Sequence, residues 1–92
     1  MNRSRLHILY SGRVQGVGFR YTVKRLASGF EVSGTIRNLH DGRVDLIAEG
    51  TTEELEAFRR AIQCSEVGRF IRQEDVNWAE AAGGFRGFEI VS

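Results

Sequence analysis

The stretch LHILYSGRVQGVGFRYTVKRLASGF, residues 6–30, contains a strand pattern, a glycine-rich loop and a helix pattern in that order. Apolar residues alternate over residues 6–10, which predicts a β-strand. Residues 12–18 hold three glycines and predict a loop. From Phe19 onward the apolar residues recur at helical spacing, which predicts a helix that ends near Gly29. These residues therefore predict a strand-loop-helix unit.

Beyond this unit, residues 32–39 predict a second strand. Asp41-Gly42 is a strong hairpin signal, so the turn at 40–43 leads into a third strand over 44–49 that ends at Gly50.

A second helix is predicted to begin at Thr51, because Thr51 and Glu54 have the spacing of a capping box. After this helix the pattern weakens. A strand is expected within 67–78, Gly83-Gly84 marks a turn, and residues 88–91 predict a short last strand.

The order of these elements is β-α-β-β-α-β with one additional strand. That order predicts the α+β class: a ferredoxin-like split βαβ sandwich, an antiparallel sheet with two helices on one face and a short extra C-terminal strand. A chain of 92 residues fits a single domain, residues 1–92.

The composition is that of an ordinary globular protein, with 41% hydrophobic and 27% charged residues. The formal net charge of +1 argues against binding a nucleic acid by bulk electrostatics. We find no signal peptide and no apolar run near the ~20 residues of a membrane span. We therefore expect a cytoplasmic monomer with no nucleic-acid or membrane partner. The single cysteine, Cys64, is expected to be a small buried or half-buried hydrophobe.

The loop from Gly12 to Arg20 joins the first predicted strand to the first predicted helix. A glycine-rich loop at a helix start can turn its backbone N–H groups inward and form a cradle for an anion. Arg20 lies in the first helical turn, where its charge opposes the helix dipole. A bound phosphate would remove that conflict, and the planar guanidinium could hold two of its oxygens. The alternative is a solvated arginine beside a flexible turn.

Two common phosphate motifs are excluded in this loop. The residues after Gly12 do not supply the Gly-Lys-Ser/Thr of a Walker A sequence. The dinucleotide fingerprint begins at Gly16 and Gly18, but Tyr21 stands where its third glycine should be.

Three blocks of sequence carry a resemblance to one family. The first is Val14-Gln15-Gly16-Val17 followed by Phe19-Arg20; the second is Gly34, Asn38, Asp41-Gly42, Val44 and Gly50; the third is Gly87-Phe88-Glu89-Ile90. In this order, and over nearly the whole chain, they resemble the signatures of the acylphosphatase family. Thr35 and Tyr10 depart from the family pattern, which usually has an aromatic and a branched aliphatic residue at these positions.

The resemblance implies an enzyme that hydrolyses the carboxyl–phosphate bond of small acyl phosphates, with inorganic phosphate as product and inhibitor. It implies that Arg20 binds the substrate phosphate and that Asn38 positions the attacking water. The backbone N–H groups that would hold the other phosphate oxygens are those of Gln15, Gly16, Val17, Gly18 and Phe19. No metal, cofactor or covalent intermediate is required by this chemistry.

Other functions fit these residues less well. RNA-recognition domains share the predicted topology, but their third strand carries stacking aromatics and residues 43–49 have none. His7 and His40 are isolated in the sequence, so no metal site is predicted. A second candidate is a non-catalytic phosphate- or carbamoyl-phosphate-binding module, because acylphosphatase-like domains occur fused to carbamoyl-transfer enzymes of hydrogenase maturation.

Overall fold

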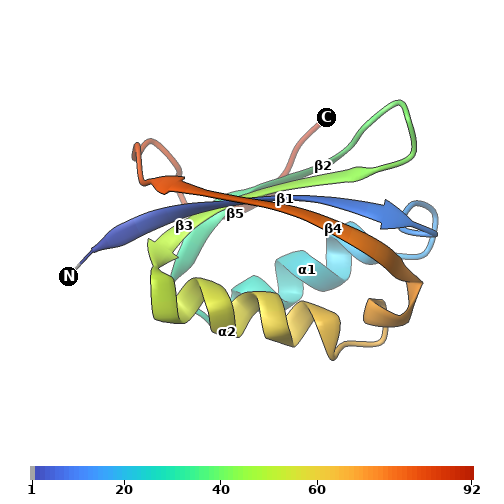
Figure 1. Cartoon of the computed structure of the whole chain (residues 1–92), viewed down its shortest axis with the longest axis horizontal. Coiled ribbons are helices and arrows are strands. Elements are labelled where there is room, and N and C mark those ends of the chain that lie inside the picture. The colour runs from blue at the N-terminus through green and yellow to red at the C-terminus, as the bar shows by residue number, and fades with distance from the viewer. Residues whose placement is uncertain (1) are drawn as a thin grey trace.

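A computed structural model describes residues 2–92 of the chain. Within them, a five-stranded sheet has two helices on one face and leaves the other face open (Figure 1). The strands are β1 (Arg3–Gly12), β2 (Val32–Asn38), β3 (Val44–Thr51), β4 (Ile71–Glu80) and β5 (Phe88–Ile90); the helices are α1 (Phe19–Ala27) and α2 (Thr52–Gln63). A short 3₁₀ helix, Gly68–Phe70, precedes β4.

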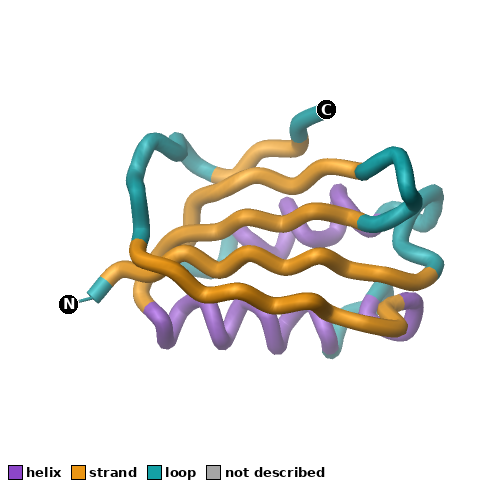
Figure 2. The backbone as a smooth tube through the Cα atoms, turned by 45° about the horizontal axis from the view of Figure 1, so that its top comes forward, coloured by secondary structure: helices purple, strands orange, loops and turns teal. Residues whose placement is uncertain are grey.

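The strands lie in the order β4-β1-β3-β2-β5 across the sheet (Figure 2). β1 pairs antiparallel with β3 and β4, and β2 pairs antiparallel with β3. β1 and β2 are therefore parallel to each other with β3 between them, which is the split βαβ arrangement. The expected ferredoxin-like fold is confirmed.

The last strand makes the sheet mixed instead of wholly antiparallel. β5 pairs parallel with β2, through Gly34 with Phe88 and Ile36 with Ile90. The chain leaves β4 at one edge of the sheet and turns back through residues 81–87, so β5 runs opposite to β4, which is the direction of β2.

The core lies between the sheet and the two helices. Alternate residues along the middle of β1 and β3 point into it and are fully buried: Leu6, Ile8 and Tyr10, and Val44, Leu46 and Ala48. Phe58 of α2 contacts both Phe30 and Phe88, with ring centroids 5.7 Å apart in each pair. Burying a side chain of this size stabilises the fold by about 1.5–3 kcal/mol.

Side-chain hydroxyl groups form hydrogen bonds at the C-terminal end of α1 and at the N-terminal end of α2. α1 ends at Ala27, two residues before Gly29, and its C-cap is Ser28, whose hydroxyl donates to the Arg25 carbonyl at 2.6 Å. α2 begins as expected, with the Thr51 hydroxyl accepting the Glu54 N–H at 3.2 Å.

Two details of α2 differ from the expectations. The Glu54 carboxylate accepts the Glu31 N–H at 2.7 Å, so it joins α2 to the segment before β2 and does not complete the capping box. Cys64 is exposed, not buried or half-buried. It occupies the C-cap of α2, beyond Ile62, where the buried stripe of the helix ends.

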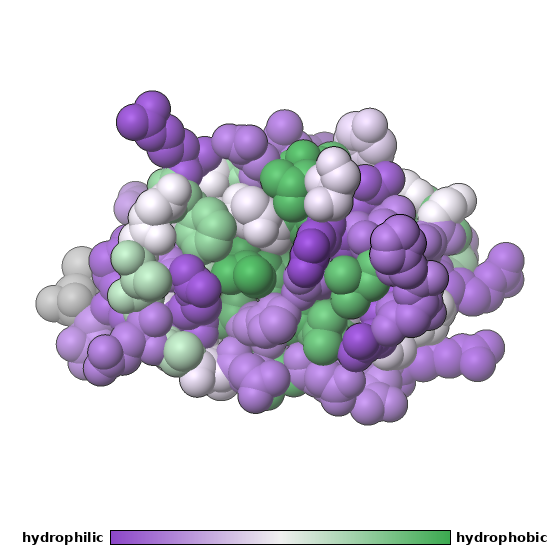
Figure 3. All heavy atoms as spheres, turned by 90° about the horizontal axis from the view of Figure 1, so that it is seen from above, coloured by the Kyte–Doolittle hydropathy of each residue, from purple (hydrophilic) through white to green (hydrophobic). Residues whose placement is uncertain are grey.

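The open face of the sheet is hydrophilic around a central hydrophobic patch (Figure 3). Its first buried carboxylate is Asp45, which is 6% exposed. Asp45 pairs with the imidazole of His7 on β1 and with the Arg37 guanidinium on β2, so it joins three strands.

Glu49 is the second buried carboxylate of this face and is 1% exposed. It accepts hydrogen bonds from the Arg5 guanidinium at 2.8 Å and from the Ala82 and Gly83 N–H groups at 2.9 and 3.0 Å. Burial by itself would raise the pKa of Glu49, but these donors outweigh it and hold the pKa below its ordinary value. Glu49 therefore fastens the loop after β4 to the sheet.

Stability should depend on pH through Glu49. Because folding lowers the pKa of Glu49, the unfolded chain binds the proton more readily, so this stabilisation is present above the ordinary pKa and is lost as pH falls through the folded value. Glu49→Gln should lower the free energy of unfolding at pH 7 by about 1.5–3 kcal/mol and reduce its acid dependence. Urea denaturation between about pH 3 and 7 measures both.

Glu80→Gln, which changes an exposed carboxylate on β4, is the matched control and should leave the acid dependence unchanged. An acid dependence equally steep in Glu49→Gln and in the unmodified chain would show that another group titrates.

Candidate functional site

The loop between β1 and α1 is held firmly at its start. Val14 is 1% exposed and packs into the core, and the Arg13 N–H donates to the Phe70 carbonyl at 3.0 Å. Gly16 and Gly18 have φ angles of 78° and 80°, a left-handed conformation that side chains rarely adopt. A Cβ at either glycine would meet nothing within 4 Å. Glycine is needed here for the backbone turn, and it leaves the space beside the turn open.

The helix after this loop starts without a side-chain cap. Gly18 is the N-cap of α1 and the first turn contains no acidic residue, whereas α2 has the Thr51 hydroxyl together with Glu53 and Glu54. The first N–H groups of a helix have no intrahelical partner, and the positive end of the helix dipole lies there. The start of α1 is therefore suited to an anion, whereas the start of α2 is already satisfied.

Arg20 adds a positive charge at the same place. It is half-buried in the first turn of α1. Within residues 2–92 it forms no ion pair, whereas five other arginines do. Its charge therefore strengthens the positive potential of the helix start.

Asn38 approaches from the end of β2, where it pairs with Val44 of β3. By strand alternation it lies on the same, helix-covered face as the fully buried Ile36. Its Oδ1 atom is buried and has no hydrogen-bond partner among the described residues. A buried polar atom left unpaired costs about 1–3 kcal/mol, so it is expected where a water or ligand completes the bond.

The predicted site residues gather around two adjoining hollows. The smaller has a volume of about 210 Å³ and is lined by Val14, Gly16, Gly18, Phe19, Arg20, Tyr21 and Asn38. The wider has a volume of about 550 Å³ and is lined by Gln15, Arg20, Asn38, Leu39, His40, Val91 and Ser92. Val17 packs against the core, so its predicted part rests on its backbone N–H alone. Arg20 and Asn38 belong to both hollows.

Several residues that line these hollows were not predicted as site residues from the sequence. Tyr21 is 72% exposed beside the smaller hollow, and its only signal was its place after Arg20. Val91 reaches the wider hollow because its N–H donates to the Ile36 carbonyl at 2.9 Å as an extension of the β5–β2 pairing. Parallel pairing of a three-residue strand leaves no mark in the sequence.

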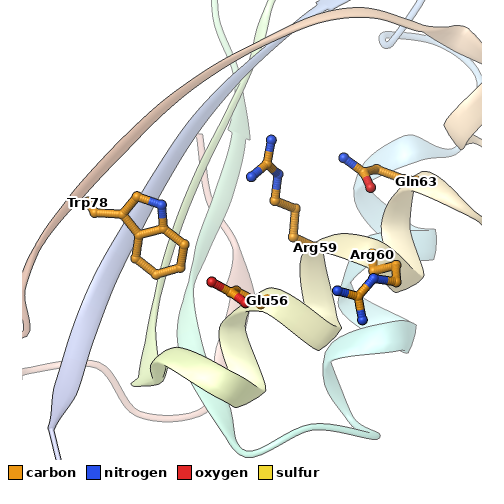
Figure 4. A pocket seen from close by; sticks show the side chains of 5 residues that line it. All are labelled: Glu56, Arg59, Arg60, Gln63 and Trp78. Atoms are coloured by element: carbon orange, nitrogen blue, oxygen red, sulfur yellow. The ribbon is translucent and has the colours of Figure 1, made fainter.

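Another hollow, of about 320 Å³, lies between α2 and β4 and contains none of the predicted residues (Figure 4). Arg59 and Arg60 of α2 and Trp78 of β4 are among its walls. The Arg59 guanidinium already donates to the Glu74 carboxylate at 2.7 and 3.0 Å. This half-buried carboxylate neutralises the charge of Arg59, so Arg59 attracts an anion weakly.

Among the described residues there is no group of three or more His, Cys, Asp or Glu side chains that could hold a metal ion. Neither helix of residues 2–92 has the length and apolar character of a membrane span.

Known proteins resemble this chain in sequence and in structure. The family model of acylphosphatases matches residues 6–90. The acylphosphatase of Thermococcus kodakarensis is 44% identical over 92 residues, covering 99% of each chain. The crystal structure of the acylphosphatase from Bacillus subtilis matches with a TM-score of 0.88 at 34% identity, covering 97% of this chain and 99% of that one. The crystal structure of full-length HypF in the phosphate- and nucleotide-bound form matches at a TM-score of 0.84 and 27% identity, over 98% of this chain and 12% of that one.

The structure is a ferredoxin-like domain in which a turn with two left-handed glycines precedes a helix that has no side-chain cap at its start. The chain belongs to the acylphosphatase family. The predictions of this family, of its fold and of an acylphosphatase enzyme are confirmed.

Alanine at Gly16 or Gly18 should weaken phosphate binding more than it destabilises the fold. The Cβ has room, so the cost to folding comes from the left-handed backbone, about 1–2 kcal/mol. Relaxation of that strain would turn the loop N–H groups away from the hollow. The inhibition constant of inorganic phosphate, measured with a thermal melt, tests this.

Gly84→Ala is the matched control. Gly84 has a positive φ of 96° and an equally open Cβ position, but it lies in the loop after β4. Normal phosphate binding by both loop variants would place the anion elsewhere.

Proposed function

We propose that the chain hydrolyses the carboxyl–phosphate bond of acyl phosphates by direct attack of an oriented water, with no covalent intermediate. The products are a carboxylate and inorganic phosphate. One observation carries the proposal. Arg20, which pairs with no carboxylate within residues 2–92, and the unpaired Oδ1 of Asn38 line the same hollow at the uncapped start of α1.

The phosphoryl group occupies the smaller hollow in this mechanism. The backbone N–H groups of residues 15–19 and the Arg20 guanidinium donate to its oxygens. Phosphoryl transfer passes through a loose transition state in which negative charge is spread over three oxygens. Donors that are fixed before the reaction stabilise this state without reorganising, so position and charge supply most of the catalysis.

The acyl group occupies the wider hollow, which shares Arg20 and Asn38 with the smaller one. Its walls combine the apolar Leu39 and Val91 with the polar His40. The departing oxygen needs no acid catalyst, because a carboxylate is a stable anion near neutral pH. The reaction therefore does not require the exposed His40 in the wall of this hollow to act as an acid.

Asn38 holds the nucleophile. Its Oδ1 atom accepts a hydrogen bond from the attacking water, which completes the bond that the protein leaves open. The water oxygen forms a bond to phosphorus as the bond from phosphorus to the carboxylate oxygen breaks. The proton of the water passes to a phosphoryl oxygen. Positioning of the water takes the place of a general base in this scheme.

Phosphate binding without turnover is a second candidate. It rests on the likeness to a segment of HypF, a much longer protein whose structure was determined with phosphate bound. The same cradle would serve carbamoyl phosphate, which is also a mixed anhydride.

Turnover of benzoyl phosphate in ¹⁸O-labelled water tests the proposal. Direct attack at phosphorus should place the label in phosphate and leave benzoate unlabelled. The rate should survive exhaustive chelation, because no step uses a metal. Label in benzoate would show attack at the carbonyl carbon. Phosphate binding without turnover would contradict the proposed hydrolysis and support the second candidate, a non-catalytic binding module.

Arg20→Ala and Asn38→Ala should fail differently. Arg20 touches the phosphoryl group before and during the reaction, so its loss should raise the phosphate inhibition constant and lower kcat together. Lysine should not rescue it, since a point charge lacks the bidentate fork. Asn38→Ala should lower kcat by about 10²-fold, while competitive inhibition by phosphate stays nearly normal. A folded, fully active Asn38→Ala enzyme would remove Asn38 from the mechanism.

A further inference from the structure

The side chain of Gln15 crosses from the loop to the turn between β2 and β3. Its Nε2 amide donates to the Leu39 carbonyl at 2.8 Å and to the Arg43 carbonyl at 3.0 Å. These partners lie 24 and 28 residues further along the chain. Both acceptors are carbonyl oxygens, so the two N–H groups of the Gln15 amide satisfy both of them, which a side chain without N–H donors cannot do.

Both carbonyls lie in the turn directly beyond the Asn38–Val44 pair, where β2 ends and β3 begins. Leu39 follows Asn38 directly, and the Leu39 N–H donates to the Arg43 carbonyl at 2.8 Å, which closes the turn. Gln15 therefore binds the closed end of the hairpin, one residue beyond Asn38 on β2 and one residue before Val44 on β3. On the loop side it precedes Gly16, which lines the smaller hollow.

We propose that Gln15 is a positioning residue for the reaction, whose amide sets the distance between the phosphate cradle and Asn38. This inference rests on the proposed function. The phosphoryl group is held by the loop and by α1, whereas the water is held by β2. The water must lie in line with the bond that breaks, so the spacing of these two elements determines the rate. The Gln15 side chain donates across that gap.

Each half of the site is held independently of Gln15. The loop is anchored by the buried Val14 and by the Arg13 N–H, which donates to the Phe70 carbonyl. The turn is closed by its own backbone bond and by the pairing of β2 with β3. Loss of the Gln15 amide therefore leaves both halves folded and loosens only their relative placement.

The test uses two substitutions of similar size. Gln15→Met removes both donors. Gln15→Glu replaces the amide by a carboxylate that faces two carbonyl oxygens. Each should lower kcat for benzoyl phosphate about tenfold, with the phosphate inhibition constant changed less than about twofold. Gln63→Met is the matched control, because the Gln63 amide also joins two elements, α2 and Glu74 of β4, but in the other hollow; its kcat should be unchanged.

A double-mutant cycle with Asn38→Ala separates positioning from a general structural role. If Gln15 acts through Asn38, adding Gln15→Met to Asn38→Ala should lower kcat by less than about twofold further. An equal tenfold loss in both backgrounds would overturn the inference, as would a parallel loss of phosphate binding or unchanged kcat in the folded variants. Should Gln15→Met not fold, the same cycle is read with Gln15→Glu, and failure of both to fold would make Gln15 structural. Full activity of Asn38→Ala alone contradicts the proposed function instead, so the two failures are distinguishable.

Discussion

The burial of β1 in the middle of the sheet is the constraint on which the site depends. β1 pairs with β3 on one side and with β4 on the other, and its buried side chains face the helices. A shift of the pairing by one residue would turn these side chains to the open face of the sheet. β1 and β2 are parallel, so their C-terminal ends lie at the same end of the sheet. The loop after Gly12 and Asn38 at the end of β2 meet there for that reason.

The segments that the sequence predicts well are those whose side chains face two clearly different environments. The alternation in β1 and the helical spacing after Phe19 reflect one buried and one exposed side, and the Thr51 cap depends on a local hydrogen bond. β4 is an edge strand with mostly exposed or half-exposed side chains, so its pattern is weak and its limits, Ile71–Glu80, could not be drawn. The exposure of Cys64 depends on where the buried stripe of α2 ends, and the parallel pairing of β5 depends on a strand about 50 residues earlier, so neither can be read from a local stretch of sequence.

The site itself was partly predictable for a physical reason. A glycine turn before a helix that has an arginine in place of an acidic residue conflicts with ordinary helix preferences, and such local conflicts are concentrated at functional positions. The relation of Asn38 to the loop requires the topology, and the Gln15 bridge requires atomic contacts between residues 24 and 28 positions apart. Family resemblance names Asn38 from the sequence, but gives no account of how the strand end is held against the loop.

The chain satisfies most of its buried polar groups, which gives meaning to those it leaves open. Asp45 and Glu49 each have two or more donors on the open face. Among the described residues, the buried side-chain atoms without a partner are the Tyr10 hydroxyl and Asn38 Oδ1. Burial, and after it the nearby Glu74 carboxylate, raise the pKa of Tyr10, so its hydroxyl stays protonated.

These two unpaired atoms have different surroundings. The Tyr10 ring packs against Phe19, the first residue of α1, with ring centroids 5.1 Å apart. This aromatic contact offsets the energetic cost of leaving the Tyr10 hydroxyl unpaired. Asn38 faces a hollow and gains no such contact in return. The unpaired oxygen of Asn38 is therefore better explained by a partner that arrives with the substrate than by packing.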